Sequence, residues 1–141
     1  MAAALGYHAD GTKARLCFHL QADSYDTDSL IKVLEQLATF YSGQRVVLVW
    51  DGLSSHWSHT MRAHLDAQRH WLRVERLPAY APELNPVEYL WANLKDLELA
   101  NLPTTSLAEV ADATEQGIQR ICNSDRLAVG FLAHTGLSLD P

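Results

Sequence analysis

The most constraining stretch is a short apolar run near the middle of the sequence, "RVVLVW" at residues 45–50. Gly43 precedes the run and Asp51-Gly52 follows it, so turn-forming residues bound it on both sides. A continuous valine-rich run of this length is typical of a strand buried on both faces, as central parallel strands are. Because parallel strands need crossover connections, usually helices, the run predicts an α/β fold.

Patterns on either side of this run fit that fold class. Residues 1–22 hold two strand-like pieces around an Asp10-Gly11 turn, which predicts a hairpin. Apolar residues at helical spacing predict a helix over about residues 30–41. The further expected elements are a helix with Trp57, Met61 and Leu65, a strand at 71–77, a helix after Pro86 and a last long helix opened by a capping box at 106–109.

Composition places the chain among ordinary globular proteins. Its 141 residues are 48% hydrophobic, which predicts one domain with a single core. No run is long enough to span a membrane and the start does not resemble a signal peptide, so we expect a cytoplasmic protein with no membrane partner. Cys17 and Cys122 are far apart in the sequence, and both are interpreted as buried small hydrophobic residues.

A proline-rich loop leads into a helix in "LPAYAPELNPVEYLWANLK", residues 77–95. Asn85 is predicted as the helix N-cap and Pro86 as the first helical residue, because proline lacks the N–H that this position leaves unpaired. Glu88 is then the third helical residue. Its carboxylate either reaches back to the Asn85 amide as half of a capping box, or serves a function in a rigidly held place.

Asp51 ends the predicted central strand, and functional groups in open α/β sheets gather at the carboxyl ends of strands. Alternatively, Asp51 only caps the turn with Gly52, as aspartate often does. Two carboxylates, Asp51 and Glu88, are also what two-metal phosphoryl chemistry requires, since Mg²⁺ prefers oxygen ligands. A rival zinc site is disfavoured, because the candidate histidines include no pair four residues apart on one helix face. These histidines are His56, His59, His64 and His70.

Residues 46–56, "VVLVWDGLSSH", together with residues 77–95 resemble the second half of the catalytic core of bacterial insertion-sequence transposases in the mariner-like superfamily. The order of features is similar: a strand ending in Asp, a His, a proline loop with Leu-Asn-Pro, then Glu, Trp and Lys on one helix. The 36 residues between Asp51 and Glu88 are similar to the family's short spacing between its last two acids. The resemblance covers roughly residues 1 to 101.

This resemblance implies an integrase-like core with a ribonuclease H-like fold, a mixed sheet flanked by helices. It also implies an Asp-Asp-Glu triad that cleaves and transfers DNA strands at transposon ends with two Mg²⁺ or Mn²⁺ ions. Asp51 and Glu88 are then the second and third acids of the triad, both catalytic and metal-binding. Transposon-end DNA is the implied partner, with a homo-oligomer or pairing with an intact transposase. The protein would be associated with the nucleoid when it is bound to DNA.

Other residues take supporting roles in the same comparison. Lys95 lies two helical turns beyond Glu88 on the same face, where its charge could hold a DNA phosphate. His56 matches a family histidine near the site and is also expected to contact DNA or phosphate. Asn85, Pro86 and Trp91 are expected to support the site, with the Trp91 ring mainly in the core.

The chain also departs from the family pattern. Family members usually have Asn after the second acid, where this chain has Gly52. The strand that carries the first acid and the DNA-binding helix-turn-helix are expected upstream of residue 1. The sheet is therefore predicted to lack its first, central strand, so that either residues 1–8 pair with 45–50 or an open edge remains.

These departures predict that residues 1–141 are one truncated catalytic-core domain that does not cut or join DNA alone. The alternative is an inactive remnant that acts, if at all, as an interaction or regulatory module. Its 11 basic and 17 acidic residues give a net charge of −6, which predicts weak, salt-sensitive DNA binding.

Overall fold

The computed structural model describes residues 1–11, 13–21, 23–100 and 106–139. The chain divides into two compact units, each considered by itself below. One unit consists of residues 1–2 and 23–81, and the other consists of residues 3–22 and 82–141. This division does not test the expectation of one domain over residues 1–141, which stays a prediction.

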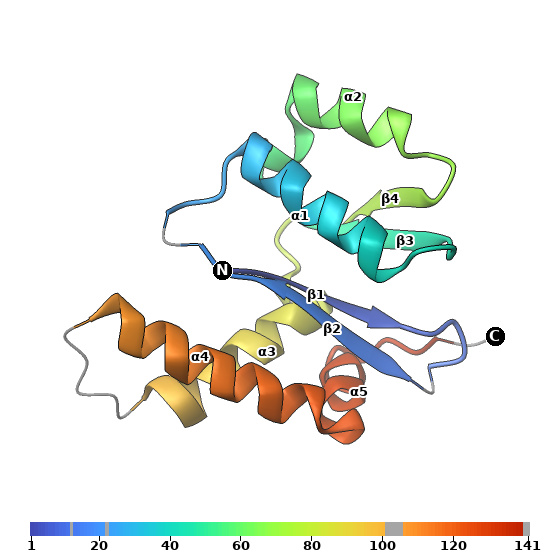
Figure 1. The fold of residues 1–141 in the computed structure, drawn as a ribbon. Helices are drawn as coiled ribbons and strands as arrows, with labels where there is room; N and C mark the ends of the chain where they lie inside the picture. Colours follow the sequence, from blue (N-terminus) through green and yellow to red (C-terminus); the bar gives the residue numbers. More distant parts are fainter. Residues whose placement is uncertain (12, 22, 101–105, 140–141) are drawn as a thin grey trace. The chain divides into compact units, whose positions relative to one another are not determined.

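The first unit contains the helices α1 and α2 and a pair of parallel strands, β3 and β4 (Figure 1). In chain order its elements are α1 (Thr27–Phe40), β3 (Val46–Trp50), the 3₁₀ turn η1 (Ser54–Trp57), α2 (His59–Ala67) and β4 (Leu72–Arg76). The register runs from Val46 opposite Leu72 to Trp50 opposite Arg76. Because the strands are parallel, their carboxyl ends lie at the same edge, just before Asp51 and Leu77.

Local sequence explains where the helices of this unit begin. The Asp26 carboxylate accepts the backbone N–H of Ser29, and the Ser29 hydroxyl oxygen accepts the N–H of Asp26, a reciprocal capping box for α1. Ser58 caps α2 by accepting the N–H of Met61. The buried apolar side chains come from α1, α2 and β4: Leu30, Leu34, Leu37, Met61, Leu65 and Leu72.

Strand β3 differs from its prediction in burial. Val47 is 60% exposed and Val49 is 51% exposed, whereas Val46, Leu48 and Trp50 are half-buried. The strand was predicted to be buried on both faces, and that expectation is wrong for the described structure. β3 pairs with β4 alone among the described residues, so its side chains alternate between a packed and an exposed face.

The described residues of the second unit form a strand hairpin and the helices α3, α4 and α5 (Figure 1). Strands β1 (Ala2–Tyr7) and β2 (Ala14–His19) are hydrogen-bonded neighbours, and their short connection requires an antiparallel pair. After the 3₁₀ turn η2 (Pro82–Leu84) come α3 (Pro86–Leu94) and the π-helical turn η3 (Lys95–Leu99). The chain ends with α4 (Leu107–Cys122) and α5 (Asp125–His134).

The core of the second unit joins its hairpin to its helices. One buried cluster contains Leu16, Leu90, Leu94, Ile118, Ile121 and Phe131. A Cβ atom at Gly117 would collide with Leu94 and Glu98, so glycine is needed there for α4 to approach the helix before it. The Tyr7 hydroxyl donates to the Ala128 carbonyl oxygen at 2.9 Å, which connects β1 to α5.

Most predicted elements are confirmed. The strands form two separate pairs, so in the described part of the chain residues 1–8 do not pair with β3, and the alternative of an open edge on β3 holds there. Helix α5 was not predicted as a separate element. Cys122 is exposed, because it lies one residue past the buried stripe of α4 that ends at Ile121, and Cys17 is half-buried. The interpretation of Cys122 as a buried hydrophobic residue is therefore wrong.

No helix among the described residues is both long and apolar enough to cross a membrane.

Candidate active site

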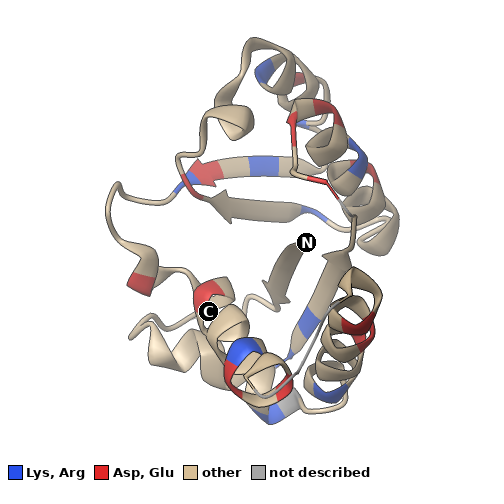
Figure 2. Cartoon of the chain, turned by 90° about the vertical axis from the view of Figure 1, so that its left-hand side faces the viewer, with Lys and Arg blue, Asp and Glu red and all other residues tan. Residues whose placement is uncertain are grey.

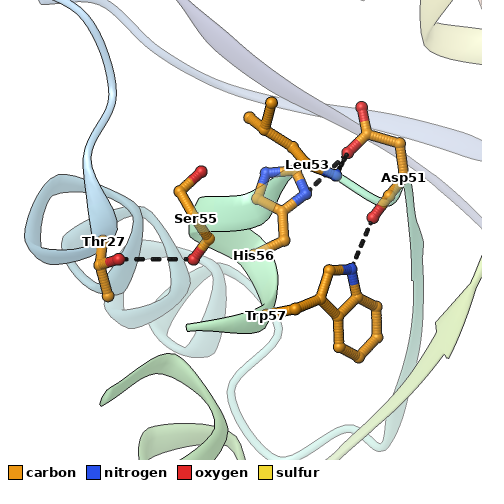
Figure 3. A network of polar contacts seen from close by, with 6 residues as sticks. All are labelled: Thr27, Asp51, Leu53, Ser55, His56 and Trp57. Carbon is orange, nitrogen blue, oxygen red and sulfur yellow. Dashed lines mark hydrogen bonds and ion pairs between the residues drawn. The ribbon is translucent and has the colours of Figure 1, made fainter. Parts of the chain in front are cut away.

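Asp51 lies directly after β3 at the carboxyl edge of the parallel pair (Figure 3). Its Oδ1 atom accepts the backbone N–H of Leu53 at 3.0 Å, so the turn-capping role considered for this residue is present. Its backbone carbonyl accepts the indole N–H of Trp57 at 2.9 Å. Neither contact uses Oδ2, and the side chain is exposed. Capping the turn therefore leaves one carboxylate oxygen available to a ligand.

His56 lies against Asp51 and Trp50. Its Nδ1 atom is 2.8 Å from Asp51 Oδ1, and its ring stacks on the Trp50 indole at 4.2 Å between centroids and 6° between planes. Nδ1 is shielded from solvent and has no aligned hydrogen bond among the described residues, so its nearest polar neighbour is the Asp51 carboxylate. This geometry orients the Asp51 carboxylate. The expectation that His56 contacts DNA or phosphate stays a prediction.

The loop around Asp51 is attached to helix α1 by a hydroxyl network. The Thr27 Oγ1 atom lies 3.5 Å from the carbonyl oxygen of Ser55, to which it donates (Figure 3). The same atom lies 3.0 Å from Ser58 Oγ, the cap of α2. These contacts fix residues 54–58 relative to α1, and thereby fix the position of the His56 ring.

Glu88 lies in the first turn of α3, in the second unit. Asn85 caps this helix by accepting the N–H of Val87 at 3.2 Å, and Pro86 is the first helical residue, as predicted. The Asn85 N–H donates to the Pro82 carbonyl at 2.9 Å. Glu88 therefore does not complete a capping box. Its exposed carboxylate has no hydrogen-bond or ion-pair partner among the described residues.

Lys95 and Trp91 lie further along the same helical segment. Lys95 is exposed and is the first residue of the π-helical turn η3. Glu98 in this turn forms a 2.7 Å ion pair with Arg120 of α4. Trp91 is partly buried and packs against the core cluster of the second unit. This packing supports the structural role expected of Trp91.

The two predicted acids belong to different units, Asp51 to the first and Glu88 to the second. Their approach to a shared metal ion stays a prediction. Within the described ranges, no group of three or more His, Cys, Asp or Glu side chains gathers as metal ligands do. Asp51 and Glu88 each present carboxylate oxygens, the donors that hard divalent cations prefer, and their role as metal ligands stays a prediction.

Sequence reasoning did not single out Arg76, whose guanidinium lies beside Gly52 and over the Trp57 ring. Its position depends on the β3–β4 register, which no local motif encodes. The signal that could have drawn attention to this place is Gly52, directly after Asp51.

Comparisons with known proteins bear on this site. The crystal structure of the catalytic domain of Mos1 mariner transposase is similar to this chain, with a TM-score of 0.54. The identity is 16%, over 96% of this chain and 74% of that chain, so the likeness shows a shared fold. A search of curated proteins finds no match.

A family model described as DDE superfamily endonuclease matches residues 6–109, which is more than half of the chain. The matched range includes Asp51, the proline loop and Glu88. With a mixed α/β fold similar to a mariner transposase catalytic domain, the chain belongs to the DDE superfamily endonucleases.

Proposed function

We propose that this chain is catalytic-core material of a DNA transposase, in which Asp51 and Glu88 hold divalent metal for DNA strand cleavage and strand transfer. The observation that carries the proposal is the state of the two carboxylates. Each follows a rigid local structure, and each keeps at least one exposed oxygen without a partner in the described part of the chain.

Mg²⁺ or Mn²⁺ suits these ligands, because both cations prefer carboxylate and water oxygens. When bound, such ions activate an attacking oxygen and neutralise charge that develops on phosphate. The protein's own residues then have distinct tasks. His56 orients the Asp51 carboxylate, and Asn85 with Pro86 fixes the start of α3 so that Glu88 projects from a set position. Lys95, exposed two turns further on, contacts a DNA phosphate.

The experiment is a thermal unfolding titration with Mn²⁺ and Mg²⁺ on the unaltered chain and on Asp51→Asn, Glu88→Gln and Glu115→Gln. Glu115 is an exposed acid on α4 and serves as the matched control. A metal held by the native site stabilises the fold by about 1.4 kcal/mol at tenfold excess over its Kd. We expect this stabilisation in the unaltered chain and in Glu115→Gln, and its loss in the other two variants.

Equal stabilisation of all four proteins would contradict a metal site at Asp51 and Glu88. If the metal ions stabilise none of the four proteins, the result would favour the non-catalytic alternative, in which the chain acts through interactions alone. DNA cleavage assays with transposon-end duplexes then ask whether metal binding supports strand cleavage.

A further inference from the structure

Arg76 is the last residue of β4 and lies opposite Trp50 in the parallel register. The chain continues from Trp50 into Asp51, so Arg76 is at the same sheet edge as that acid. Its guanidinium carbon is 5.4 Å from the centroid of the Trp57 ring, a cation–π distance. The Trp57 indole is itself fixed by its bond to the Asp51 carbonyl.

Gly52 accounts for the space that this guanidinium occupies. A Cβ atom at position 52 would collide with Nη2 of Arg76 and would lie 3.1 Å from Nε and 3.2 Å from Cζ. Gly52 is not among the glycines with positive φ, so its backbone conformation does not require glycine. Glycine at position 52 therefore leaves room for the Arg76 guanidinium in its observed place, and a larger residue would displace it.

Arg76 differs from nearby arginines in that it forms no ion pair among the described residues. Arg73, on the same strand, pairs with Glu75 at 2.7 Å, and Arg69 pairs with Asp66. Arg76 has no carboxylate within ion-pair distance among the described residues, and its side chain is exposed. A guanidinium offers a planar fork of donors that matches phosphate oxygens, and stacking on an aromatic ring limits its rotation before any ligand binds.

We propose that Arg76, held by Trp57 and admitted by Gly52, binds a phosphate of the DNA backbone beside Asp51. The inference rests on the proposed function for its choice of ligand, since a DDE endonuclease site must receive a phosphodiester next to its acids. Arg76 is a binding residue in this proposal, and its guanidinium lies where a Cβ atom at position 52 would collide with it.

The experiment measures binding of a fluorescent DNA duplex by anisotropy at several KCl concentrations, with EDTA present. The proteins are the unaltered chain, Arg76→Ala, Arg73→Ala, Gly52→Ala and the double variant Gly52→Ala/Arg76→Ala. Arg73→Ala removes the same charge from the same strand at an ion-paired position. Gly52→Ala keeps the charge but displaces the guanidinium, which can move because it is the end of a flexible side chain.

We expect Arg76→Ala to weaken binding about tenfold at low salt and to lower the salt slope by about 0.9. Arg73→Ala should change affinity by less than about twofold, because its charge is already neutralised by Glu75. As a single change, Gly52→Ala should weaken DNA binding severalfold. The double variant Gly52→Ala/Arg76→Ala should bind DNA as strongly as Arg76→Ala. Circular dichroism and unfolding curves confirm that each variant is folded.

Three results would overturn the proposal: equal effects of Arg76→Ala and Arg73→Ala, an effect of Gly52→Ala that persists without Arg76, or no duplex binding by the unaltered chain. The assay contains no metal, so it is independent of the Mn²⁺ titration. If Mn²⁺ stabilises the chain but Arg76→Ala does not weaken DNA binding, this inference alone is refuted. If Arg76→Ala weakens DNA binding but Mn²⁺ does not stabilise the chain, the metal site alone is refuted.

Discussion

Glu88 is the residue whose two interpretations the structure separates most clearly. Its carboxylate does not cap α3, because the Asn85 N–H is already bonded to Pro82. Glu88→Ala should therefore change the free energy of unfolding by no more than about 0.5 kcal/mol, the scale of the lost interaction with the helix dipole. Asn85→Ala should cost about 1 kcal/mol, because it removes the side-chain cap. Urea denaturation of both variants provides the measurement.

A cost for Glu88→Ala as large as that for Asn85→Ala would show that Glu88 has a capping role after all. Both variants alter the N-terminus of α3, so their changes in unfolding free energy can be compared directly.

At this scale, the acids are more predictable from sequence than their surroundings. Asp51 and Glu88 each lie in a local motif, a strand end and a proline-defined helix start, and both motifs are confirmed. The placement of Arg76 depends on which residues of β3 and β4 face each other, which is a non-local property. The contact between His56 and Asp51 likewise depends on how the 51–58 loop folds back toward α1.

At the scale of elements, the contact between β1 and α5 makes the free energy of unfolding vary with pH in the alkaline range. Burial raises the pKa of Tyr7 to about 12, above the value near 10 of an unfolded chain. The stability contributed by the neutral phenol is fully present below pH 10 and is lost as pH rises toward 12, because the unfolded chain releases its proton first. Tyr7→Phe should cost about 1 kcal/mol at pH 8 through the lost hydrogen bond to Ala128.

The difference in unfolding free energy between the unaltered chain and Tyr7→Phe should then shrink between pH 8 and pH 11.5. Urea denaturation at both pH values measures it. Tyr80→Phe is the control, since the Tyr80 ring is fully exposed and should show no difference at either pH. A Tyr7→Phe difference that stays constant would mean that Tyr7 ionises equally easily in the folded and unfolded chain.

Helix α3 also allows a test of how the Trp91 side chain packs. Because the ring is only partly buried, Trp91→Ala should cost about 2 kcal/mol, below the 3–5 kcal/mol typical of fully buried aromatic residues. Leu90→Ala, at a side chain that is 0% exposed, should cost about 3 kcal/mol. Thermal or urea unfolding measures both, and an unchanged stability in Trp91→Ala would exclude a structural role for the ring.

Elements with a clear period were predicted well, and those without one were not. The run at 45–50 shows that a strand is present, but an unbroken apolar run cannot show which side chains face the core. Helix α5 has Gly130 in its interior, which weakens a local helix signal. Its helical structure depends on tertiary packing, because Ala128 and Phe131 are buried in the second unit.

At the scale of the whole molecule, the net charge predicts the affinity of the chain for DNA. Figure 2 shows acidic and basic positions interspersed over the described part of the chain. With a net charge of −6, the chain should bind duplex DNA with a Kd weaker than about 1 µM at physiological salt, and more weakly as salt rises. Anisotropy titrations at several KCl concentrations measure this affinity, and nanomolar binding at physiological salt would contradict the prediction.

The bond between Asn85 and Pro82 has a consequence for how such a protein can change over evolutionary time. Since α3 begins without help from Glu88, a mutation of this acid would leave a folded chain. Cellular proteases remove chains that unfold, so they would not distinguish this mutant from its parent. Under the proposed function this mutation removes a metal ligand without unfolding the chain, so the mutant protein would persist in the cell at normal abundance.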